Sequence, residues 1–105
     1  MLRIYSFIVE TLKVTGPIIQ QIAKHDGDLA RQARRAASSI ALNTAEGAGN
    51  DGGNRRLRYR SALGSTHEVG AALDVAEALG FIAPVDAGLR DRFDRIAATL
   101  YRLAQ

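Results

Sequence analysis

The side chains with the clearest chemistry in this sequence are arginines gathered in its middle third. The run Arg55-Arg-Leu-Arg-Tyr-Arg60 places four guanidinium groups around one tyrosine. Guanidinium groups bind phosphate oxygens, and an exposed tyrosine ring stacks on a nucleic-acid base. With two upstream arginines on the outward side of their helix, these residues predict a nucleic-acid-binding surface. Its members are Arg31, Arg34, Arg55, Arg56, Arg58, Tyr59 and Arg60.

The positive charge is concentrated in the same segment. The 105-residue chain carries a net charge of +3, whereas residues 31–60 alone carry seven arginines against Glu46 and Asp51. Such an uneven distribution favours an anionic partner, which here means RNA, DNA or an RNA–protein complex. The alternative is a structural or protein-interaction scaffold in which the same arginines contact neighbouring subunits.

Other motifs give no enzyme or cofactor site. The segment Gly47–Gly52 satisfies the pattern G-x-G-x-x-G, but a dinucleotide site needs a preceding strand and this segment follows a predicted helix. The chain has no cysteine, and His25 and His67 stand apart in the sequence. Glu46 and Glu68 lack the Glu-x-x-His partners of a di-iron bundle. We therefore expect no catalytic residue, no metal site, no cofactor and no enzymatic activity.

Helices must position these groups, because alanine is abundant and proline is scarce. Apolar residues recur every three or four positions and predict a single domain over residues 1–105, with helices at about 2–24, 28–48, 55–79 and 86–104. Gly16-Pro17 predicts a kink in the first helix or two helices in tandem, and Gly47–Asn54 predicts a loop. Short connections favour an all-α, antiparallel up-down-up-down four-helix bundle.

Two of these helices carry polar residues beside their apolar stripes. On the third helix we expect Leu57, Gly64 and Val75 to face inward, with Glu68 among them. Aligning the second and third helices about their loop places Arg35 within one turn of Glu68, and a buried carboxylate needs a charged partner. We therefore expect a buried Arg35–Glu68 contact within a structural polar network. The network comprises Gln32, Arg35, Ser39, Asn43, Glu46, Ser65 and Glu68.

Several leucines fall outside the predicted core. Leu42, Leu63 and Leu73 are expected on the outward faces of their helices. A second apolar face on so small a bundle favours assembly with further copies of the chain. We therefore expect an oligomer larger than a dimer.

Three segments of the sequence resemble a known family. They contain Asn43-x-x-Glu46-Gly47, Gly64-Ser65-x-x-Glu68 and Leu79-Gly-Phe-Ile82. Together they resemble the four-helix bundle proteins encoded in intervening sequences of bacterial 23S ribosomal RNA genes, which are related to the accessory variability protein of diversity-generating retroelements. The resemblance implies a homopentameric ring without enzymatic activity. In the retroelement branch it also implies nucleic-acid binding and a reverse transcriptase as partner.

No stretch of the chain predicts contact with a membrane. Every apolar run falls short of the roughly 18 residues that a membrane-spanning helix needs. The apolar start of the chain is interrupted at Glu10, and no small-residue cleavage site follows it. We therefore expect a cytoplasmic protein.

Overall fold

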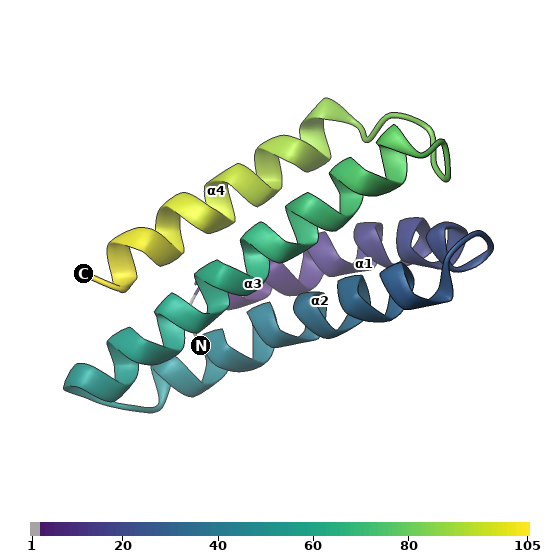
Figure 1. The fold of residues 1–105 in the computed structure, drawn as a ribbon. Coiled ribbons are helices and arrows are strands. Elements are labelled where there is room, and N and C mark those ends of the chain that lie inside the picture. Colours follow the sequence, from purple (N-terminus) through teal and green to yellow (C-terminus); the bar gives the residue numbers. More distant parts are fainter. Residues whose placement is uncertain (1–2) are drawn as a thin grey trace.

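Four helices account for nearly all of residues 3–105, the part of the chain that the computed structural model describes. They are α1 (Arg3–Ala23), α2 (Gly27–Ala48), α3 (Gly52–Ala78) and α4 (Ala87–Leu103), and no strand occurs among these residues. Figure 1 shows each helix turning back alongside the one before it, in a molecule 43 Å long. The all-α, four-helix prediction is confirmed. The predicted start of the first helix at Leu2 lies outside the described residues.

Aspartates define the first turns of two helices. The Asp26 carboxylate accepts a hydrogen bond of 2.9 Å from the Leu29 amide at the start of α2. The Asp86 carboxylate accepts one of 3.2 Å from the Leu89 amide at the start of α4. Each aspartate satisfies a backbone donor that the first helical turn leaves without a partner. The beginnings of both helices are therefore encoded locally.

The first helix continues through Gly16-Pro17 without a break, so the prediction of two helices in tandem is wrong. Proline has no amide hydrogen, and the Lys13 carbonyl consequently loses its usual donor. The side chains of Thr15 and Ile19 are buried on either side of the proline. Their packing on the core outweighs the missing hydrogen bond.

The loop between α2 and α3 is shorter than the predicted Gly47–Asn54. It contains only residues 49–51. The second helix extends through Gly47, against which the Tyr59 ring packs. Gly52 adopts a φ of +56°, a left-handed conformation that favours glycine, and this sharp turn lets α3 begin at once.

The core is aliphatic, and its side chains are smallest between α2 and α3. Its largest fully buried aliphatic side chains are Ile8, Ile22, Ile40, Val69, Leu73, Ile96 and Leu100. Alanines make up most of the buried residues of α2, and three more lie on α3. These two helices make the most extensive contact of any helix pair, because small side chains let the two backbones approach. The α2–α3 hairpin is thus the most closely packed part of the bundle.

The predicted inward face of α3 is wrong. Leu57, Gly64, Glu68 and Val75 are exposed. The buried line of α3 lies on the other side of the helix and comprises Tyr59, Ala62, Thr66, Val69, Ala72, Leu73 and Ala76. Both sides of α3 carry apolar residues, and the bundle buries the side that holds the larger number of them.

This rotation also corrects the predicted second apolar face. Leu73 belongs to the core and Leu63 is half-buried, so only Leu42 of the predicted leucines is largely exposed, at 65%. In their place, Leu57 and Leu79 are 54% and 60% exposed. The outward apolar line therefore exists, but it is built mainly by residues that the sequence pattern assigned to the core.

Candidate nucleic-acid interface

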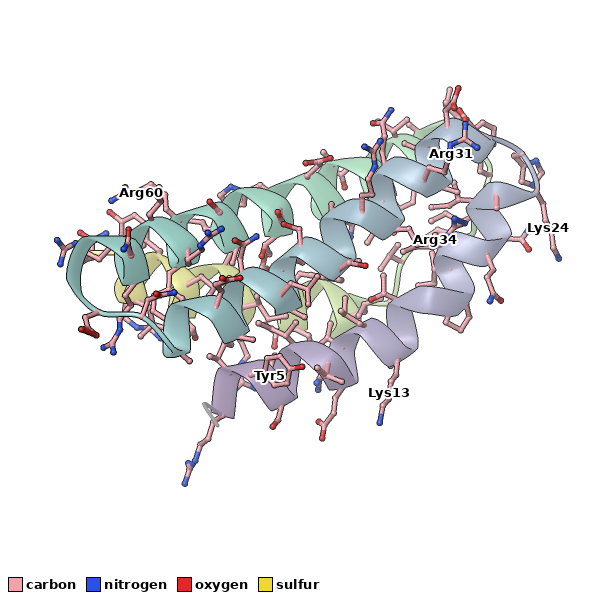
Figure 2. All side chains as sticks on the ribbon, turned by 90° about the horizontal axis from the view of Figure 1, so that it is seen from below. Tyr5, Lys13, Lys24, Arg31, Arg34 and Arg60 are labelled. Carbon is pink, nitrogen blue, oxygen red and sulfur yellow. The ribbon has the colours of Figure 1, made fainter. Side chains whose placement is uncertain are left out.

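The structure divides the predicted arginine surface between two ends of the bundle. Arg31 and Arg34 lie near the start of α2, whereas Arg55–Arg60 open α3. Figure 2 shows Arg31 and Arg34 at the end opposite Arg60. The arginines that the sequence placed in one surface therefore form two separate groups.

The arginines at the start of α3 do not share one face. At 100° per residue their side chains point to different sides of the helix, although all four are exposed. Three of them donate to acceptors of the same chain. The acceptors are Asn50 O for Arg55 Nε at 2.8 Å, Asn43 Oδ1 for Arg58 Nη1 at 3.5 Å, and Ala104 O for Arg60 Nη2 at 3.4 Å. This group joins the start of α3 to its neighbours as well as presenting charge to solvent.

Tyr59 does not lie at the surface, so its prediction as a base-stacking residue is wrong. It is only 2% exposed, and its ring contacts Gly47 of α2. A Cβ atom at position 47 would lie 2.7 Å from Tyr59 Cε1. Tyr59 belongs to the inward face of α3, where it fills the space that a glycine leaves open.

Part of the predicted polar network is present, half-buried between α2 and α3. The Ser65 hydroxyl donates to Ser39 Oγ at 2.8 Å, and Asn43 Nδ2 donates to the same oxygen at 2.9 Å. Asn43 Nδ2 also lies 3.1 Å from the Ser39 carbonyl. The Ser65–Ser39 bond crosses the hairpin close to the predicted alignment of the two helices, and the Asn43–Ser39 bonds lie within α2.

The charged members of that network are exposed instead. Arg35 and Glu68 are both exposed, and no ion pair joins them within residues 3–105. Gln32 and Glu46 are not buried either. The predicted buried Arg35–Glu68 contact is therefore wrong, because α3 turns Glu68 outward and leaves both charges in water.

Two lysines that the sequence analysis did not predict extend the group of Arg31 and Arg34 into a larger basic surface. It consists of Lys13 of α1, Lys24 of the turn that follows α1, and Arg31 and Arg34 of α2, and is named here the α1–α2 basic surface. In Figure 2, Lys24, Arg31 and Arg34 lie toward one end of the bundle and Lys13 lies further along α1. All four side chains are exposed. Among the described residues, the only ion pair that this group makes joins Arg31 to Asp28, and both partners are largely exposed. An exposed pair of this kind neutralises little charge.

The two lysines were overlooked because the first thirty residues carry equal numbers of acidic and basic side chains. The sequence feature that indicates their common location is the spacing between Lys13 and Lys24. Eleven residues correspond to about three helical turns, so Lys24, which directly follows the last residue of α1, is expected near the same side of the helix as Lys13. The acid nearest to Lys13 in sequence, Glu10, is directed toward α4, where its carboxylate lies 3.8 Å from Arg92 Nη2.

A polar cluster also closes the opposite side of the bundle, between α3 and α4. Glu77 Oε1 accepts a hydrogen bond of 2.6 Å from the Val85 amide and one of 3.1 Å from Arg90 Nη2, which also contacts Asp74 at 2.9 Å. The hydrogen bond from the Val85 amide is the main cause that lowers the pKa of Glu77. Desolvation of the carboxylate opposes this shift, and the hydrogen bond and positive charge of Arg90 add to it. This cluster fixes the loop before α4.

The described residues offer little for other chemistry. No three histidine, aspartate or glutamate side chains of residues 3–105 gather as a metal ion requires. None of the helices over these residues is long and apolar enough to cross a membrane. The exposed cations therefore remain the main chemical feature of the surface.

Comparison with protein families identifies the chain over nearly its whole length. Residues 4–102, nearly the whole chain, match the family described as 23S rRNA-intervening sequence protein. No curated protein and no solved structure matches the chain.

Proposed function

The chain belongs to the 23S rRNA-intervening sequence protein family, and from this premise we propose that it is a non-enzymatic helical bundle that binds RNA, or an RNA–protein complex, as a cytoplasmic oligomer. Its exposed cations make the contacts, and they meet phosphate groups rather than base edges. Contacts of this kind position a protein on nucleic acid without reading its sequence.

The α1–α2 basic surface is the observation that carries this proposal. Lys13, Lys24 and Arg34 contact no carboxylate within residues 3–105, and Arg31 contacts only Asp28. Their charges are therefore available to a polyanion. Each phosphate that such a surface neutralises releases bound counterions from the nucleic acid, which makes binding favourable at low salt.

The arginines at the start of α3 have a smaller part in the proposal. Arg55, Arg58 and Arg60 already donate to acceptors of the chain, and an RNA contact has to compete with those bonds. Arg56 is exposed at the same end. We assign this group a supporting role, in which it adds to the positive potential.

We further propose that the chain forms a homo-oligomer, with the pentameric ring as the expected size from the family resemblance. The exposed apolar residues Leu42, Leu57, Val75 and Leu79 support assembly. An oligomer places several basic surfaces on one frame, so that weak contacts act together. A reverse transcriptase is a proposed further partner only for a chain that functions within a retroelement.

A protein-interaction scaffold is the second candidate function. The outward apolar line of α3 and the internal contacts of its arginines favour it, because both features suit contact between proteins. In a scaffold the cations serve subunit contacts, and the protein has no appreciable affinity for RNA.

Two matched variants test the proposal. One changes Lys13, Lys24, Arg31 and Arg34 to glutamine, and the other changes Arg55, Arg56, Arg58 and Arg60 to glutamine. Each lowers the net charge from +3 to −1. We expect the first variant to lose most of the affinity for a generic RNA. The slope of log affinity against log salt concentration should also become less negative, by about 0.7 to 0.9 for each phosphate that is no longer neutralised. The second variant is expected to lose less.

The comparison of the two variants distinguishes an effect of net charge from an effect of the α1–α2 basic surface. Equal losses in both variants attribute binding to net charge and contradict the assignment to α1 and α2. An unmodified protein that fails to bind RNA at low salt overturns the proposal and favours the scaffold. Circular dichroism and sedimentation of both variants show whether fold and assembly persist.

A further inference from the structure

A hollow lies in the seam between α1 and α4, away from the α1–α2 basic surface. It has a volume of ≈ 340 Å³ and is lined by Arg3, Ile4, Phe7, Arg95 and Thr99. Ligand pockets begin at about 300 Å³, which makes this hollow large enough for one small molecule. Two of the five lining residues carry positive charge and none carries negative charge.

Arg95 is held in position without being neutralised. Its guanidinium carbon lies 4.7 Å from the centre of the Phe7 ring. Asp91 lies one turn earlier on α4, yet no carboxylate of residues 3–105 lies within ion-pair distance of Arg95. The aromatic ring therefore orients the guanidinium and leaves its hydrogen-bond donors to a ligand.

The neighbouring Arg92 shows the contrast. Its Nε donates to Thr11 Oγ1 at 2.8 Å, and its Nη2 donates to Phe7 O at 3.3 Å and lies 3.8 Å from a Glu10 carboxylate oxygen. Arg92 also stacks on Phe7, at 4.0 Å from the ring centre. Arg92 therefore joins α1 to α4, whereas Arg95 has no such set of contacts.

Charge and shape together indicate the ligand. A phosphate monoester carries about −1.5 to −2 at neutral pH, which matches two guanidinium groups better than the single charge of a phosphodiester. Thr99 supplies a hydroxyl, and Ile4 and Phe7 supply an apolar wall. We propose that this hollow binds a nucleotide through a terminal phosphate monoester, with Arg3 and Arg95 on the phosphate oxygens and the base or ribose against Ile4 and Phe7.

The adjoining hollow on the same seam does not fit this ligand. It shares Arg95 but is also lined by Asp86 and Asp91, and its volume is ≈ 620 Å³. Carboxylates repel a phosphate, so the monoester is restricted to the side of Arg95 that faces Arg3 and Thr99.

Free nucleotides and RNA ends offer the same chemical group, and only the second source rests on the proposed function. The first experiment titrates the protein with adenosine monophosphate and, separately, with adenosine, following the backbone amides of Phe7 and Thr99 and the Arg95 Nε by nuclear magnetic resonance. We expect the monophosphate to shift these signals and to bind at least about tenfold more tightly than adenosine. The second experiment compares one short RNA with a 5′-phosphate and with a 5′-hydroxyl.

Three variants test whether the preference for the monophosphate arises at this hollow. Arg3→Gln and Arg95→Gln are each expected to reduce the preference for the monophosphate about tenfold or more. Arg35→Gln removes the same charge from an exposed position in the middle of α2 that does not line the hollow, and it should leave that preference unchanged. The preference is the ratio of the affinity for the phosphorylated ligand to the affinity for the unphosphorylated one. A change that affects both affinities equally therefore leaves this ratio unchanged.

The outcomes separate the two proposals. Equal binding of adenosine and its monophosphate, or shifts that avoid Phe7, Arg95 and Thr99, overturns the nucleotide site. Monophosphate binding without a preference for 5′-phosphorylated RNA supports the site and identifies its ligand as the free nucleotide. Absence of all RNA binding contradicts the proposed function, while the monophosphate titration still decides the nucleotide site.

Discussion

The ring of Tyr59 on α3 occupies the space that Gly47 leaves open on α2. A Cβ atom at position 47 would lie 2.7 Å from Tyr59 Cε1 and 3.0 Å from Cδ1 and Cζ. Tyr59 is 2% exposed, so its ring has little room to retreat. This contact fixes the rotation of α3 at its first turns and thereby the directions in which its arginines point.

The first prediction concerns this contact. Gly47→Ala should destabilise the fold by about 1–3 kcal/mol, because overpacking against a buried ring exceeds the gain in helix propensity of about 1 kcal/mol. Thermal unfolding measures the change. Gly70→Ala is the control, since no atom lies within 4 Å of its added Cβ, and the propensity gain should make it neutral or stabilising. A stable Gly47→Ala protein would show that the ring moves easily.

The second prediction follows from the outward rotation of Glu68. Glu68→Ala should change the free energy of unfolding by less than about 0.5 kcal/mol, as surface substitutions usually do. Ser65→Ala removes the hydrogen bond to Ser39 and should cost about 1 kcal/mol. Chemical denaturation at several protein concentrations distinguishes the two. A large cost for Glu68→Ala that grows with concentration would place Glu68 in a contact between subunits.

The third prediction is a dependence of stability on pH. The folded pKa of Glu77 lies below its ordinary value of 4.5, so its ionised form stabilises the fold. This contribution is complete above pH 4.5 and is lost as the pH falls through the lower, folded pKa. Melting temperatures between neutral and acidic pH should show the loss, and Glu77→Gln should reduce it. Glu46→Gln, at a position that is not buried, serves as control; a parallel acid response in all three proteins contradicts the prediction.

The fourth prediction separates the two arginines that stack on Phe7. Arg92→Gln removes hydrogen bonds to Thr11 and Phe7 and should destabilise the fold by about 1–2 kcal/mol. Arg95→Gln should cost less than about 0.5 kcal/mol, because its charge makes no ion pair within the described chain. Equal costs would mean that Arg95 also serves stability, which weakens its role in the nucleotide site.

The fifth prediction tests assembly. Changing Leu57, Val75 and Leu79 together to glutamine removes the outward apolar line of α3 without touching the core. Sedimentation should show an oligomer for the parent chain and monomers or smaller species for the variant, with the same helical content. A parent chain that sediments as a monomer at micromolar concentration contradicts the proposed oligomer.

Periodicity in the sequence predicted the four helices, and local features explain where they begin and how they pack. The aspartate caps at Asp26 and Asp86, the glycine-rich turn before α3 and the small residues between α2 and α3 all act within a few positions or across one short loop. Such features leave a direct trace in the order of residues. The family resemblance added the motif around Gly47, which the structure explains through Tyr59.

The rotation of α3 and the position of the basic surface were harder to predict. Two lines of α3, one through Leu57 and Val75 and one through Val69 and Leu73, both satisfy helical periodicity. The choice between them depends on contacts with other helices, and periodicity alone does not contain it. Lys13 and Lys24 were hard to predict for a similar reason, because the summed charge of a segment ignores the face on which each charge lies.

The loop of three residues between α2 and α3 also bears on how the chain reaches its fold. A short loop joins the most closely packed helix pair, so little chain entropy is lost when that pair forms. Contacts close in sequence are the ones that form fastest. The α2–α3 hairpin is therefore suited to be the folding nucleus, onto which α1 and α4 dock.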